Sequence, residues 1–187
     1  PTVLGDSTLR LFEDCGIKSV AQLPENVRVK VKHMFASFGT YGPRLATEAR
    51  RKDQTFYSAQ NEQGNLNSAI GYYNITKWVS GTQTYIGKGT RTSRYTTNTW
   101  YKDETLIYGS SIKYIVASGA ETVTATDTEI TGPGYVTLSS WSSGNDVRID
   151  WVFISKYVDP EPSHGTWGGE ETIGPPTNIF YPGISTE

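Results

Sequence analysis

The chain is organised around one stretch near its end, Val147-Arg-Ile-Asp-Trp-Val-Phe-Ile-Ser-Lys-Tyr-Val-Asp-Pro-Glu-Pro162. Strict alternation along it predicts a strand that has Ile149, Trp151 and Phe153 on one face and Val152 and Ile154 on the other. Because both faces are apolar, this strand needs cover on both sides. The two prolines lack the N–H donors that strand pairing requires, so we expect the strand to end before them.

The chain before this stretch is predicted to form a series of short strands. Turn signals rich in Gly, Pro, Asn and Ser recur every ~8–12 residues, and no amphipathic helix longer than a turn or two is evident. This pattern predicts an all-β protein, an antiparallel sandwich of two sheets. We expect the sandwich to occupy residues 1–158 and a Pro/Gly-rich extended tail to occupy 159–187.

Val27–Phe35 gives the clearest alternation, with valines on one side and Arg28, Lys30 and Lys32 on the other. The basic side is read as a solvated sheet face with acidic cross-strand neighbours, in preference to an anion site. His33 falls on the apolar side and is expected to be a hydrogen-bonded core residue, since no metal-ligand spacing links it to the only other histidine.

Composition limits the possible partners. The formal net charge is −2, from 17 basic and 19 acidic residues, which argues against nucleic acid as a partner. No apolar run approaches the ~20 residues that span a bilayer, so direct membrane insertion is not expected. Cys15 is the only cysteine, so an internal disulfide is impossible.

Several phrases carry a family resemblance: Ser111-Ile-Lys-Tyr-Ile-Val116, Val123-Thr-Ala-Thr-Asp127, Gly134-Tyr-Val-Thr-Leu138 and Ile149-Asp-Trp-Val-Phe-Ile154. Their order resembles the second half of laminin G-like, concanavalin A-like jelly rolls. The end of the last strand with its Pro-Glu-Pro is similar to the version found in archaeal and bacterial cell-surface proteins. The resemblance implies a jelly roll at an extracellular or cell-surface location, in a family that includes glycan binders, adhesion modules and structural spacers.

The same resemblance implies a possible calcium ion where the first and last strands meet. It nominates Asp6, Glu13 and Asp150, whose carboxylates would join the two ends of the sandwich. The alternative is that Asp150 only hydrogen-bonds a neighbouring group. We therefore expect either no cofactor or one structural Ca²⁺.

Sugar binding would require exposed aromatic rings beside polar loop groups. Tyr41, Tyr95 and Trp141 lie in or beside predicted loops and are the candidates. The other tryptophans that we considered, Trp78, Trp100 and Trp151, are expected in the core.

Catalysis is not expected. No strand carries carboxylates at alternating positions, as a glycosidase of this fold would need, and no Gly-x-Ser-x-Gly elbow is present. A glycoside hydrolase therefore ranks third among the functional hypotheses.

The tail contains large apolar residues, among them Trp167, Ile179, Phe180 and Tyr181, which a simple linker would not place in water. Two interpretations remain open. The tail folds back over its own sandwich, or it lies on a neighbouring copy, with Val152 and Ile154 among the residues it covers. The leading hypothesis is a non-catalytic extracellular adhesion module or self-assembling subunit that contacts other copies or other surface proteins. The alternative is a carbohydrate-binding module.

Overall fold

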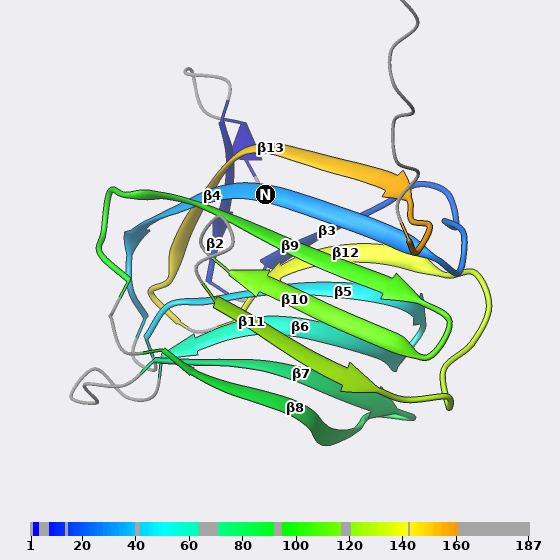
Figure 1. Cartoon of the computed structure of the whole chain (residues 1–187). Coiled ribbons are helices and arrows are strands. Elements are labelled where there is room, and N and C mark those ends of the chain that lie inside the picture. The colour runs from blue at the N-terminus through cyan, green and yellow to red at the C-terminus, as the bar shows by residue number, and fades with distance from the viewer. Residues whose placement is uncertain are drawn as a thin grey trace, which may run out of the picture.

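The computed structural model describes residues 2–3, 8–13, 15–39, 42–63, 71–91, 95–116, 121–141 and 143–160. These residues form two antiparallel sheets that pack face to face, and within them there is no helix (Figure 1). In this part of the chain no helix is long and apolar enough to cross a membrane. The predicted two-sheet sandwich is confirmed.

The first sheet has seven strands. Their spatial order is β1 (Thr2–Val3), β2 (Leu9–Phe12), β13 (Asp146–Lys156), β4 (Val27–Ser37), β9 (Trp100–Tyr108), β10 (Ser111–Val116) and β11 (Glu121–Thr126).

The second sheet has six strands. Their spatial order is β3 (Cys15–Lys18), β12 (Tyr135–Ser140), β5 (Arg44–Lys52), β6 (Thr55–Gln63), β7 (Gly71–Val79) and β8 (Thr82–Arg91). Figure 1 shows this sheet lying behind β9, β10 and β11 of the first.

The core lies between the sheets and is built from alternate residues of their strands. Val27, Val29 and Val31 of β4 are each 1% exposed and belong to one cluster with Val136 and Leu138 of β12. The residues between these positions point outward. Period-two alternation in these strands therefore defines an inner and an outer face for each sheet.

A β-bulge in β13 changes the predicted orientation of this strand. Ile149 pairs with His33 and Trp151 pairs with Lys32, which leaves Asp150 as an extra residue. Past the bulge the faces exchange. Val152 and Ile154 pack against the core, whereas Trp151 and Phe153 are 38% and 53% exposed.

The prediction that both faces of this strand are covered is therefore wrong at Trp151 and Phe153. Ile149, which alternation grouped with them, is 2% exposed and lies in the core. Val152 and Ile154 are partly buried and pack against the protein's own core. Their contact with the tail or with a neighbouring copy stays a prediction.

The outer face of β4 confirms the interpretation of its basic residues. Arg28 forms an ion pair with Glu104 of β9, and the Lys32 ammonium lies 2.6 Å from an Asp150 carboxylate oxygen. On the inner face, His33 is 0% exposed and its Nε2 lies 3.0 Å from Asp103 Oδ2. The core histidine is therefore confirmed.

Candidate functional site

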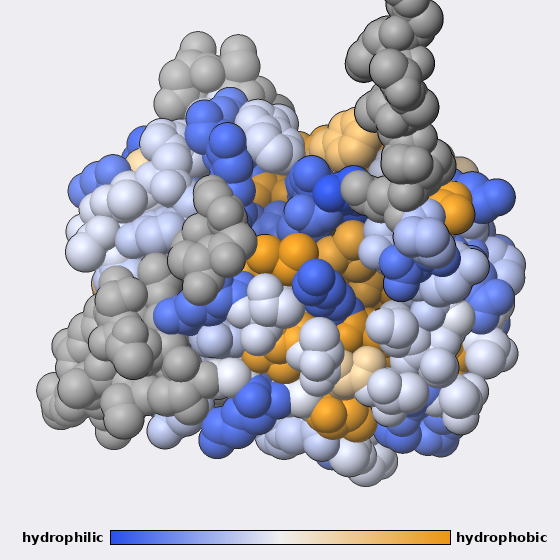
Figure 2. All heavy atoms as spheres, in the orientation of Figure 1, coloured by the Kyte–Doolittle hydropathy of each residue, from blue (hydrophilic) through white to orange (hydrophobic). Residues whose placement is uncertain are grey.

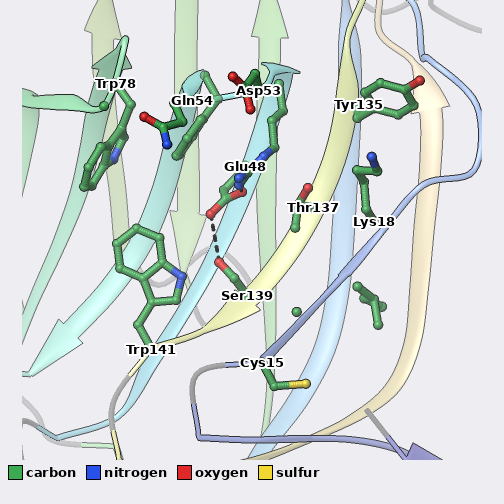
Figure 3. Close-up of a pocket in the computed structure, with 15 residues that line it drawn as sticks. Cys15, Lys18, Glu48, Asp53, Gln54, Trp78, Tyr135, Thr137, Ser139 and Trp141 are labelled. Atoms are coloured by element: carbon green, nitrogen blue, oxygen red, sulfur yellow. Dashed lines mark hydrogen bonds and ion pairs between the residues drawn. The ribbon is translucent and has the colours of Figure 1, made fainter.

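A pocket of about 840 Å³ opens on the outer face of the six-stranded sheet. Its walls come from β3, β12, β5, β6 and β7, together with the β5–β6 and β7–β8 turns (Figure 3). We call it the sheet pocket. It is lined by Cys15, Gly16, Ile17, Lys18, Glu48, Arg51, Asp53, Gln54, Phe56, Trp78, Gly81, Tyr135, Thr137, Ser139 and Trp141.

Alternation in β12 explains why this strand supplies much of the floor. Val136 and Leu138 point into the core, so Tyr135, Thr137 and Ser139 point outward into the pocket. Thr137 pairs directly with Glu48 of β5. One sheet face therefore places two hydroxyls and a carboxylate side by side.

A bulge in β5 brings Arg51 to the pocket and turns Arg50 inward. The pairing of β5 with β6 shifts between Ala49 and Lys52, and Arg50 has a φ of 53°. The Arg50 guanidinium donates to the carbonyl oxygens of Ile130 and Gly109, each at 2.7 Å. Burial lowers the pKa of Arg50, yet these acceptors keep it anchored.

Gly134 allows this arrangement at close range. A Cβ atom at this position would lie 2.4 Å from the Arg50 carbonyl carbon, so only glycine lets the two backbones approach. The chain just before β12 is thereby held against the β5 bulge.

One end of the pocket is aromatic. Phe56 and Trp78 stack with ring centroids 5.6 Å apart and an interplanar angle of 15°. Trp141 meets Trp78 edge to face, at 5.7 Å and 77°. Figure 3 shows Trp78 and Trp141 on the same side of the pocket, beside Gln54. Phe56 is only 4% exposed, so the partly exposed rings of Trp78 and Trp141 supply the accessible surface. Their flat apolar faces are of the kind that the C–H face of a sugar ring contacts.

The centre of the pocket is polar and charged. Glu48 is 0% exposed; Ser139 Oγ donates to its Oε1 at 2.9 Å, and Arg51 forms an ion pair with its other oxygen. Burial raises the pKa of Glu48, while Arg51 and Ser139 act to lower it. The Arg51 guanidinium also lies 4.6 Å from the centroid of the Phe56 ring. These contacts fix polar groups directly beside the aromatic end.

The opposite end carries Lys18 and Tyr135. The Lys18 ammonium lies 4.4 Å from the centroid of the Tyr135 ring, and Figure 3 shows both side chains across the pocket from the tryptophans. A ligand that spans the pocket would thus meet a cation and a second aromatic ring.

Only one of the predicted ligand residues that the structure describes is found in the pocket. Trp141 lines the pocket. Tyr95 is only 4% exposed and packs against Phe35 and Tyr101, with ring centroids 5.3 and 4.8 Å away. The expected exposure of Tyr95 is therefore wrong, because an aromatic cluster at the sandwich edge encloses its ring. Tyr41 lies outside the described residues.

The tryptophans expected in the core are not there. Trp78 lines the pocket, and Trp100 and Trp151 are 39% and 38% exposed. The sequence reasoning also missed Glu48, Arg51 and Ser139. The alternation of β12 could have placed Ser139 on the outer face, but nothing local marked Glu48 as buried.

Two of the proposed calcium ligands, Glu13 and Asp150, lie within the described residues, and they are not close together. The Glu13 amide bonds the Asn145 carbonyl, and Asp150 lies five residues further along β13, about 16 Å away. Asp150 instead contacts Lys32, and Asp6 lies outside the described residues. Within the part of the chain that the structure describes, no group of three or more His, Cys, Asp or Glu could hold a metal ion.

The tail residues Trp167, Ile179, Phe180 and Tyr181 also lie outside the described residues. Their predicted contacts remain a hypothesis.

Comparison with known proteins gives a fold and no family. No family model matches the sequence, and none of the curated proteins matches it. Solved structures do share the fold.

The carbohydrate-binding module CBM66 from Bacillus subtilis is similar at 16% identity, over 76% of this chain and 82% of that chain, with a TM-score of 0.59. A Bacillus licheniformis β-glucanase matches at 14% identity, over 82% and 81% of the two chains, also at 0.59. A homodimeric agglutinin from chicken liver, CG-16, matches at 10% identity, over 75% and 99%, at 0.55. The chain thus has the jelly-roll sandwich fold of these proteins.

Proposed function

We propose that this protein binds carbohydrate in the sheet pocket and does not act on it chemically. The observation that carries the proposal is the position of the Phe56–Trp78–Trp141 cluster beside Glu48, Arg51 and Ser139. A sugar ring has an apolar C–H face and a rim of hydroxyl groups. The aromatic cluster suits the first. The Arg51 guanidinium, whose side chain is 31% exposed and which the buried Glu48 and Ser139 hold in place, suits the second.

The fold neighbours support the same class of function. One is a carbohydrate-binding module and another is an agglutinin. Because identity is low, these proteins support the proposal only through the shared fold.

Binding without catalysis is the better match to the pocket's carboxylates, even though a β-glucanase shares the fold. A glycosidase needs an acid and a second carboxylate placed on either side of the scissile bond. The pocket is lined by Glu48 and Asp53. Glu48 is engaged by Arg51 and Ser139, and Asp53 lies in the turn that joins β5 to β6.

A role at a cell surface, as an adhesion module or a self-assembling subunit, is the second candidate. The observation that favours it is the set of large hydrophobic residues, including Trp100, Trp151 and Phe153, left exposed outside the seven-stranded sheet. An extracellular location is part of this proposal, whereas a structural Ca²⁺ ion belongs to the carbohydrate-binding proposal.

A glycan array tests the proposal directly. The full chain is expected to bind a discrete set of oligosaccharides, and Trp141→Ala is expected to abolish the signal by removing one ring of the aromatic cluster. Trp100→Ala is the matched control, because it removes an exposed tryptophan from the opposite sheet. Running the array with and without a chelator tests the Ca²⁺ ion. Silence across plant, microbial and animal glycans would refute carbohydrate binding.

A further inference from the structure

The outer face of the seven-stranded sheet is unusual because exposed aromatic rings sit among basic side chains. Across the sheet, Trp151 of β13 pairs with Lys32 of β4, and Lys32 pairs with Lys102 of β9. In the next row, Phe153 pairs with Lys30. We call Trp100, Trp151, Phe153, Lys30, Lys32 and Lys102 the aromatic–basic face.

The rings of this face are substantially open to solvent. Phe153 is 53% exposed, Trp100 39% and Trp151 38%. The Lys32 ammonium lies 5.2 Å from the centroid of the Trp100 ring. Figure 2 shows hydrophobic residues among hydrophilic ones on the side where β4, β9 and β10 are in front. A solvated sheet face would ordinarily carry polar side chains here, so these rings are available to a partner.

The face also carries an excess of positive charge. The outward side chains beside β13 residues 151–155 are basic at Arg28, Lys30 and Lys32 of β4, and further across the sheet at Lys102 of β9 and Lys113 of β10. The carboxylates among them are Glu104 and Asp150, which already contact Arg28, Lys30 and Lys32. A matching partner is therefore acidic and bears apolar or aromatic side chains.

Residues 161–187 of this chain have that chemistry. They contain Glu161, Glu170, Glu171 and Glu187 and no Lys or Arg, and they include Trp167, Phe180 and Tyr181. We propose that this segment docks in extended form on the aromatic–basic face of its own sandwich. Face-to-face pairing of two copies would instead bring like charges together, which disfavours a second copy as the occupant.

The length and starting point of the segment permit this. The described chain stops at Pro160, just after β13, the strand that carries Trp151 and Phe153. Returning from Lys156 to Trp151 requires about 17 Å, whereas residues 161–167 alone span up to about 23 Å when extended. The whole segment of 27 residues spans up to about 89 Å when extended, which is long enough to bring its apolar residues to the aromatic–basic face.

The test measures proximity in the full chain by paramagnetic relaxation. A nitroxide is attached to Lys102→Cys on the aromatic–basic face or, as the control, to Tyr85→Cys on β8 of the other sheet, both in a Cys15→Ala background. Docking predicts strong broadening of the NMR signals of residues 161–187 from position 102 and weak broadening from position 85. The broadening should be largely lost in Phe153→Ser and in Lys30→Glu, and it should weaken at high salt.

Other results overturn the proposal. Equal broadening from both positions, no broadening from position 102, or full retention in both variants would show that the segment does not dock there. Mixing isotope-labelled chains without nitroxide with unlabelled chains that carry it tests for exchange between copies. Broadening in that mixture would assign the face to the segment of a second copy and would contradict docking within one chain. Unchanged sheet signals in each variant show that it has folded.

Discussion

Replacing Arg51 by Met removes the cation that faces the buried Glu48 carboxylate while keeping an apolar stem over Phe56. Removing one partner of a buried ion pair costs about 3–5 kcal/mol. The Arg51 side chain is 31% exposed and that of Glu48 only 1%, so we expect a cost at or just below the bottom of that range, about 2–3 kcal/mol of unfolding free energy at pH 8.

The cost should depend on pH in a defined direction. Burial already holds the pKa of Glu48 above its ordinary value of 4.5, and losing Arg51 raises it further. At pH values between the pKa of Glu48 in the unfolded state and its higher pKa in the folded state, the native state therefore binds more protons than the unfolded state. The stability of Arg51→Met therefore falls as pH rises through this window, and at pH 5 its deficit should shrink to about 1 kcal/mol or less.

Urea unfolding at pH 5 and pH 8 measures this difference. Lys52→Met is the matched control, since it removes the same charge from the neighbouring residue, whose ammonium makes only an exposed hydrogen bond to Thr131. Its cost should stay within about 0.5 kcal/mol at both pH values. An Arg51→Met deficit that is equal at the two pH values, or no larger than that of Lys52→Met, would refute the reasoning about a buried carboxylate.

Two further predictions concern the sandwich. Deleting Asp150 removes the extra residue of the β13 bulge but keeps Ile149 opposite His33 and Trp151 opposite Lys32, so every later residue stays on its face. We therefore expect the deletion and Asp150→Ala each to cost under about 2 kcal/mol; a much lower urea midpoint for the deletion alone would contradict this role of the bulge. Burial acts to raise the pKa of Asp127, but hydrogen bonds from Lys77 and Tyr57 outweigh it and hold the pKa below its ordinary value of 3.8. Asp127 therefore contributes stability above that value which is lost as pH falls through its folded pKa. Asp127→Asn should cost about 1–2 kcal/mol at pH 7, through the hydrogen bond from the Tyr57 hydroxyl, and should flatten the acid side of the stability profile; an unchanged acid slope would show that another group dominates there.

The sandwich could be predicted from sequence because alternation reports directly on burial in half-buried strands. The alternation predicted for β4 holds from Val27 to Phe35, including the buried His33, except that Met34 on the outer side is also buried. The acidic neighbours predicted for its basic residues are also present, since cross-strand pairing places Lys30 beside Glu104. These features depend only on the local period of the chain.

The orientation of Trp151 and Phe153 could not be predicted, because a bulge exchanges the two faces without a local signal. The extra residue, Asp150, does not signal a bulge, because a regular strand could also carry an aspartate on its outer face. The β5 bulge is similar, since Arg50 and Arg51 are chemically identical. Carbonyl oxygens distant in sequence, those of Ile130 and Gly109, select which of them turns inward.

The candidate site was predicted only in part for the same reason. Trp141 follows a strand end and could be recognised as a loop aromatic, whereas Tyr95 also lies outside the strands but is enclosed by Phe35 and Tyr101. Glu48 becomes a buried pocket residue only through Ser139 and Arg51, which reach it from β12 and from the β5 bulge.

The central claim is that the sheet pocket binds carbohydrate through its aromatic cluster. The most direct measurement is calorimetric titration of the full chain with the oligosaccharide that binds most strongly on the array, in parallel with Trp78→Ala, Trp141→Ala and the control Trp100→Ala. We expect each pocket variant to bind at least about tenfold more weakly, while the control keeps the wild-type affinity. Wild-type affinity in both pocket variants, with their fold intact, would contradict it.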